Sequence, residues 1–295
     1  MTKQEFLAWL GSGPHLLDGA TGSELLARGM PRGEKTELWV DRHPEALLEL
    51  QQAYVQAGCQ VIYAPTFQAQ AISLEKAGFP ARDTEALNAR LVRLSRRAAG
   101  PETLVAGDLA TLAADLPSWE PERLHEMTEL YRRQIGGILE GGADLLAAET
   151  LLYPTEAEAF LQAVELEGSG TAVLITFTMD ADGSFFSGRP AGPVLRELEE
   201  AGASAVGFNC VNAGSHLPAL VSRLRRQVQG PLISKPNAGD PVIDDRGRAV
   251  YSMDPASFAA FQVQAASLGA KLLGGCCGTT PAHMAALASA LRDVG

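Results

Sequence analysis

Short runs of consecutive apolar residues alternate along the chain with longer segments in which apolar residues recur every three or four positions. Eight such runs occur, and each is followed by a loop and then by a segment of helical spacing. A run without polar alternation is typical of a strand that is buried on both faces, as in a parallel sheet. The predicted strands cover residues 15–20, 61–67, 104–109, 144–150, 172–179, 205–210, 232–239 and 271–278.

Helical patterns fill the intervals, for example over residues 44–58, 122–142 and 216–228. One phrase recurs where a predicted helix gives way to a strand, as in QAGCQVI, EGGADLL, EAGASAV and SLGAKLL. Eight alternations of strand and helix predict an α/β fold, a single-domain (β/α)8 TIM barrel rather than an open doubly wound sheet. The predicted domain covers residues 1–295, with residues 1–13 as a short helical lead-in. The glycines of the recurring phrase are expected to cap helix C-termini; they are Gly58, Gly142, Gly202 and Gly269.

Composition narrows the function classes. The chain is 46% hydrophobic, which is ample for a core, and its net charge of −11 argues against a nucleic-acid partner. The first residues lack the apolar core of a signal peptide, and no apolar run approaches the length of a membrane span, so we expect a cytoplasmic protein without membrane association. Four cysteines in such a chain indicate metal binding or catalysis rather than a disulfide framework.

Catalytic residues of a TIM barrel gather at the C-terminal ends of its strands. Alternate strands contribute side chains to one interior layer, so residues at the ends of the fourth, sixth and eighth strands are expected to share a site. Three of the four cysteines lie at such ends. The predicted strand ends carry Asp18, Thr66, Asp108, Glu149, Thr150, Asn209, Cys210, Asn237, Cys276 and Cys277.

The sequence GGCCGTTP places two adjacent thiols between glycines, just before a predicted helix. In a regular strand Cys276 and Cys277 would point to opposite faces, so both reach one ion only if the chain bends or bulges there. Thr280 and Pro281 are expected at the N-cap and first position of the helix, whose dipole favours thiolates. Three thiolates without a fourth cysteine match a catalytic Zn²⁺ site that keeps one position for a substrate, here a thiol that would ionise on binding.

Four segments together resemble the zinc-dependent homocysteine S-methyltransferase family, and the resemblance extends over essentially the whole chain. They are DGATGSELLARG, FNC, KPNAG and GGCCGTTP. The resemblance implies an enzyme that transfers a methyl group to the thiol of homocysteine, giving methionine. It also implies that Cys210, Cys276 and Cys277 bind Zn²⁺ and that Asp18 and Glu149 hold the substrate's ammonium group. Thr66, Asn209 and Asn237 are expected as further substrate-binding residues.

The methyl donor is open. A sulfonium such as S-methylmethionine or S-adenosylmethionine suits a chain of this length, with the aromatic face of Trp39 or Phe67 against its positive charge. The alternative donor is a separate methyl-corrinoid or folate-linked partner protein. Three rival functions also stay open: a vicinal-dithiol redox protein, a phosphate-binding barrel enzyme and a non-catalytic zinc scaffold. The glycine-rich turn makes a poor phosphate site because no lysine or arginine follows it before Arg292.

Overall fold

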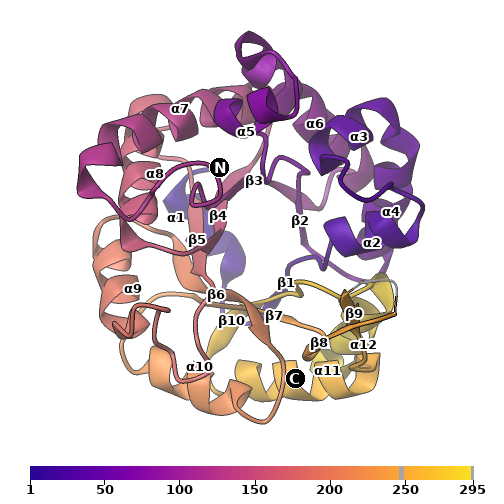
Figure 1. The fold of residues 1–295 in the computed structure, drawn as a ribbon. Helices are drawn as coiled ribbons and strands as arrows, with labels where there is room; N and C mark the ends of the chain where they lie inside the picture. Colours follow the sequence, from indigo (N-terminus) through magenta and orange to yellow (C-terminus); the bar gives the residue numbers. More distant parts are fainter. Residues whose placement is uncertain (246–248, 294–295) are drawn as a thin grey trace.

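The structure is a computed structural model that describes residues 1–245 and 249–293. Within these residues, eight parallel strands form the wall of a barrel in the order β1-β10-β7-β6-β5-β4-β3-β2 (Figure 1). A parallel bridge between Leu17 and Val61 joins the two outermost strands and closes the barrel. The strands are β1 (His15–Leu16), β2 (Val61–Tyr63), β3 (Leu104–Ala110), β4 (Leu145–Leu151), β5 (Val173–Phe177), β6 (Ala205–Asn212), β7 (Leu232–Asn237) and β10 (Ala270–Leu273).

All eight predicted strands are confirmed, and helices surround them as the outer layer (Figure 1). The recurring glycines have φ between 88° and 116°, a conformation that favours glycine at the end of a helix. The helices are α1 (Lys3–Leu10), α2 (Gly22–Ala27), α3 (Thr36–Arg42), α4 (Pro44–Gln56), α5 (Ala71–Lys76), η1 (Ala81–Asp83), α6 (Thr84–Ala99), η2 (Pro121–Arg123), α7 (Leu124–Glu140), α8 (Pro154–Glu167), α9 (Ala191–Glu200), α10 (Leu217–Arg225), α11 (Pro255–Ser267) and α12 (Pro281–Arg292).

Helix α1, which was expected in the lead-in, fills one end of the barrel interior. Phe6 and Leu10 of α1 are buried against interior side chains such as Val61, Ala106 and Leu174. The main chain of Met1 accepts a hydrogen bond from Ala172 at the start of β5, so α1 lies at the N-terminal ends of the strands. Helix α1 therefore closes this end of the barrel and leaves the C-terminal end for a site.

A short antiparallel hairpin, β8 (Pro241–Ile243) and β9 (Ala249–Tyr251), follows β7 and was not predicted. Its side chains Val242 and Ile243 are exposed, so it lacks the buried pattern that is typical of the barrel strands. Among residues 1–245 and 249–293, no helix combines the length and the apolar character needed to span a membrane.

Candidate functional site

Three thiols converge at the C-terminal end of the barrel. The Sγ atoms of Cys210, Cys276 and Cys277 all lie within 4.8 Å of one another. Cys210 is 3.2 Å from Cys276 and 3.7 Å from Cys277, measured between sulfurs. In the described part of the chain this is the one group of three or more histidine, cysteine, aspartate or glutamate side chains that could hold a metal ion. The fourth cysteine, Cys59, is buried in the core that packs outside the strands.

The two adjacent cysteines lie beyond their strand rather than in it, because β10 ends at Leu273. The turn that carries them is fixed to the end of β7: Cys276 N donates to the carbonyl oxygen of Pro236 (2.8 Å), and Ala238 N donates to that of Cys277 (2.9 Å). Gly278 follows with a φ of 78°, and a Cβ there would lie 2.2 Å from the ring of Tyr251. The expected change of direction is therefore made by a turn that requires glycine.

Cys210 reaches the same point through an irregularity in β6. Its φ is 57°, which is uncommon for a residue other than glycine, and the pairing of β6 with β7 shifts register between Asn209 and Asn212. Thr150 in β4 has the same φ and lies in a similar register shift. Asn209 links the two irregular strands, since its Oδ1 accepts from Thr150 N at 2.8 Å and its Nδ2 donates to Thr150 Oγ1 at 2.6 Å.

The three thiols do not ionise alike. Hydrogen bonds from Cys210 and Cys276 lower the pKa of Cys277 to about 3, whereas hydrogen bonding within the trio raises the pKa of Cys276. One thiolate is thus stabilised by two thiols. A metal ion would extend this ionisation to its other sulfur ligands, and three convergent sulfurs are the donor set that soft metals prefer. The residues present therefore fit a metal ion.

The thiols form part of the wall of a cavity of about 420 Å³. Its floor is the polar top layer of the barrel interior, where Asp18, Asp108, Glu149 and Lys235 lie. The segment after β1, the end of β2 with the residues that follow it, and the residues around the start of α3 complete the wall. These residues include Gly19, Thr21, Ser23, Glu34, Lys35, Glu37, Tyr63, Phe67 and Gln68.

Lys235 lies among these carboxylates and was not singled out from the sequence. Its Nζ is 2.7 Å from Glu149 Oε2 and 3.5 Å from the centre of the Tyr63 ring, and its side chain is 3% exposed. Burial alone would lower the pKa of Lys235, but the charges of Glu149, Tyr63, Asp18 and Asp108 raise it. A lysine inside the apolar run LISKPN was the available signal, because a buried lysine needs a partner.

Asp18 and Glu149, which the family resemblance assigns to the substrate's ammonium group, both line the cavity. Asp18 Oδ2 accepts a hydrogen bond from Tyr63 N at 2.8 Å. Burial raises the pKa of Asp18 to about 7, although the Lys235 ammonium and the Tyr63 N–H act in the opposite direction. The pKa of Asp18 therefore depends on the balance between burial and the positive charge of Lys235.

Three other expected residues lie behind the cavity wall rather than in it. Thr66 Oγ1 donates to the carbonyl oxygen of Asp108 (2.8 Å), and Asn237 Nδ2 donates to that of Cys210 (3.2 Å). Asn209 Nδ2 lies 3.8 Å from Cys276 Sγ. Of the two aromatic candidates, Phe67 lines the cavity, whereas Trp39 is buried in the core and packs against His43.

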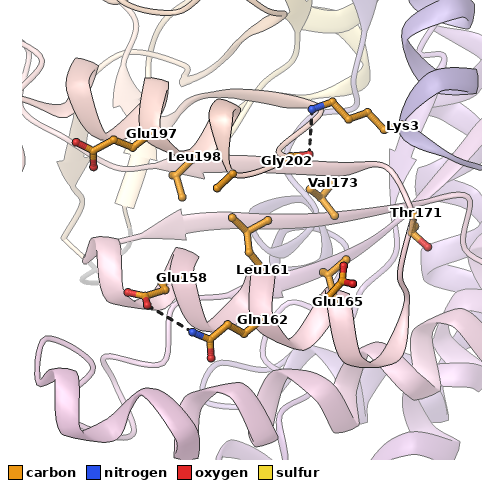
Figure 2. A pocket seen from close by; sticks show the side chains of 13 residues that line it. Lys3, Glu158, Leu161, Gln162, Glu165, Thr171, Val173, Glu197, Leu198 and Gly202 are labelled. Atoms are coloured by element: carbon orange, nitrogen blue, oxygen red, sulfur yellow. Dashed lines mark hydrogen bonds between the residues drawn. The ribbon is translucent and has the colours of Figure 1, made fainter.

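A second, larger cavity of about 550 Å³ lies outside the barrel, between α8 and α9 (Figure 2). Leu161, Val173 and Leu198 form its apolar surface. Acidic side chains also line it, and Lys3, another lining residue, donates to the carbonyl oxygen of Gly202 at 3.2 Å. It contains no thiol, and its size therefore does not make it the site of thiol chemistry.

Comparison with known proteins agrees with this geometry. The family model for homocysteine S-methyltransferase matches residues 15–291. The homocysteine S-methyltransferase of Escherichia coli is 30% identical, and the alignment covers 92% of this chain and 93% of that protein. The methionine synthase of Mycobacterium tuberculosis is 27% identical over 94% of this chain, which spans only 24% of that longer protein.

A solved structure shows the same fold. The metallated form of the E. coli homocysteine methyltransferase MmuM superimposes with a TM-score of 0.79 at 27% identity, over 96% of this chain and 98% of that one. The match to the family model covers nearly the whole chain, including the turn with the two adjacent cysteines. The chain belongs to the homocysteine S-methyltransferase family.

Proposed function

We propose that this protein transfers a methyl group to the thiol of homocysteine, giving methionine, and that Cys210, Cys276 and Cys277 hold the Zn²⁺ ion that activates this thiol. The observation that carries the proposal is the convergence of three thiols at the wall of a cavity with an acidic floor. Homocysteine has a thiol at one end and an ammonium group at the other. The site offers a matching group for each.

Each end of the substrate has its own partners in this proposal. Cys210, Cys276 and Cys277 would hold Zn²⁺, and the bound ion would supply a lowered pKa for the substrate thiol. Asp18 and Glu149 bind the ammonium group through charge-assisted hydrogen bonds. Main-chain N–H groups of residues 21–23, which line the cavity, receive the substrate carboxylate, whereas Ala20 N already donates to Thr279 Oγ1. Thr66, Asn209 and Asn237 act by holding the strand ends that carry these groups.

The donor we propose is a small sulfonium, such as S-methylmethionine or S-adenosylmethionine. The cavity supports a cationic donor, because five carboxyl groups line it against the ammonium groups of Lys35 and Lys235. The face of Phe67 adds a surface suited to a positive charge. A methyl-corrinoid or folate-linked partner remains the second candidate, supported by the match to one part of a longer methionine synthase.

Methionine formation by the zinc-loaded protein tests the proposal, with S-methylmethionine, S-adenosylmethionine, betaine and methylcobalamin supplied separately. We expect turnover with a sulfonium and none with betaine. Zinc-dependent binding of homocysteine without turnover on any of these donors would indicate that a partner protein supplies the methyl group. Failure to bind homocysteine at all would refute the proposed function.

Alanine variants of Cys210, Cys276 and Cys277 provide the matched test of the metal site. Each should lose most of its zinc, measured by elemental analysis, while Cys59→Ala retains it, because Cys59 lies in the core away from the trio. Activity that survives chelation and depends instead on a change in free thiol content would favour the vicinal-dithiol redox function. Full zinc content in all three variants would remove these cysteines from the site.

A further inference from the structure

Asp108 is a third acidic residue of the cavity floor that has no assigned role. It lies in β3, next to the strand that carries Glu149, and it lines the cavity although it is only 6% exposed. Its main chain is engaged, since Thr66 Oγ1 accepts from Asp108 N at 2.9 Å and donates to the carbonyl oxygen. Its side-chain Oδ1 has no hydrogen-bond partner among the described residues.

A buried carboxyl oxygen without a partner is costly, so its presence beside a cavity indicates a ligand that supplies a hydrogen-bond donor. Asp18 Oδ1 is also buried and has no hydrogen-bond partner among the described residues. Glu149 has one oxygen, Oε2, already bound by Lys235. The floor therefore offers carboxylate acceptors on β3, on β4 and after β1. The ammonium group of Lys235 forms a hydrogen bond with only one of them, Glu149.

The ligand that these acceptors fit is an ammonium group. It carries three N–H donors and a positive charge, whereas a carboxylate would add a further negative charge to an acidic floor. We propose that Asp108 is a third carboxylate that binds the ammonium group of the substrate, alongside Asp18 and Glu149. This inference rests on the proposed function, and it makes the primary amino group a main determinant of substrate choice.

The test compares two thiols that differ only in the amino group, homocysteine and γ-mercaptobutyrate, each titrated calorimetrically into zinc-loaded protein. Replacing Asp108 by asparagine keeps the size of the side chain and removes its charge. We expect Asp108→Asn to weaken homocysteine binding about 10- to 100-fold, as for loss of a charge-assisted hydrogen bond, and to change γ-mercaptobutyrate binding less than about 3-fold. Equal losses for both thiols, or no loss for homocysteine, would overturn the proposal.

Thr176→Val is the matched control. Thr176 is buried in β5 and also has an unpartnered side-chain oxygen, but it does not line the cavity. Its two affinities should stay at the wild-type values. If the wild-type protein itself fails to bind homocysteine, the proposed function fails; if it binds homocysteine and Asp108→Asn binds it equally well, only the role of Asp108 fails.

Proton release gives a second readout that a structural role would not move. Burial, followed by the charge of Glu149, raises the pKa of Asp108, and Lys235, Asp18 and Glu37 are the other charged groups that face it. An ammonium group bound there lowers this pKa again and so favours release of a proton from Asp108. The binding heat of homocysteine in buffers of different ionisation enthalpy should therefore show fewer released protons for Asp108→Asn than for the wild type; equal numbers would contradict the proposal.

Discussion

Lys235 and its neighbours show how this barrel tolerates charge in its interior. A buried ion costs several kcal/mol unless it is paired and hydrogen-bonded. Lys235 meets this demand through Glu149 at 2.7 Å and the face of Tyr63 at 3.5 Å. Asp18 and Asp108 are less completely hydrogen-bonded, because each keeps one carboxylate oxygen without a partner in the described structure. The protein thus satisfies only part of the hydrogen-bonding capacity of these carboxylates, and the rest is available to a ligand.

The raised pKa of Asp18 makes stability depend on pH. Burial raises the pKa of Asp18 from 3.8 to about 7, so between these values the folded state binds more protons than the unfolded state. The free energy of unfolding should therefore fall as pH rises through this window, on the order of 3 kcal/mol between pH 5 and pH 8. Urea unfolding of metal-free wild type and Asp18→Asn measures it: the advantage of the wild type should shrink with rising pH. A difference that stays constant would show that Asp18 ionises as it does in the unfolded chain.

The strand ends, rather than the strands, bring the thiols together. β6 carries Cys210 on a residue of positive φ within a register shift, and β4 repeats this irregularity at Thr150. Bulges of this kind turn side chains that regular pleating would send elsewhere. The turn after β10 does the same for Cys276 and Cys277. Two local departures from regular geometry, the register shift in β6 and the turn after β10, thus bring the three sulfurs together.

Gly278 tests the importance of the cysteine turn. Its φ of 78° opposes a side chain, and so does the Tyr251 ring, which would lie 2.2 Å from a Cβ at this position. Gly278→Ala should lower the free energy of unfolding by about 2–4 kcal/mol, through backbone strain and overpacking, and reduce zinc retention. Gly29→Ala is the control, because Gly29 has a φ of 103° but no neighbour within 4 Å. Its cost should be about 1 kcal/mol with zinc content unchanged; equal effects of both variants would show that contact with Tyr251 is unimportant.

The molecule as a whole is a barrel with one closed and one open end. Helix α1 fills the N-terminal end through Phe6 and Leu10, and the C-terminal end holds the cavity with the thiols. This division separates stability from chemistry, as is general in TIM barrels. The hairpin β8–β9 lies beside the open end, where Tyr251 packs against the cysteine turn.

Phe6→Ala should therefore destabilise the fold without changing the site. Removing this buried ring leaves a cavity in the barrel interior, and we expect a loss of about 3–5 kcal/mol in the free energy of unfolding. Leu7→Ala on the same helix should cost less than about 1 kcal/mol, because Leu7 is 39% exposed. Urea unfolding gives both values, and zinc content reports on the site. Loss of zinc from folded Phe6→Ala would show that the two ends are coupled.

The hydrophobic periodicity was sufficient to predict the barrel. Strands buried on both faces and helices with one apolar face leave a clear pattern, and glycines mark where one gives way to the other. The approach of Cys210 to Cys276 also followed, since a barrel brings alternate strand ends to one layer. These features follow from local sequence patterns and from the barrel that those patterns predict.

Other features depend on which side chains meet across the barrel, and only the tertiary structure decided them. The pairing of Lys235 with Glu149 joins residues of β7 and β4, and no local pattern encodes it. Trp39 resembled a ligand contact in the sequence but is buried in the core, because α3 turns its ring away from the cavity. Phe67, Asp108 and Thr66 are near one another, yet the first two line the cavity and the third lies behind it. Such differences follow from the direction of each side chain at a strand end, which long-range packing sets.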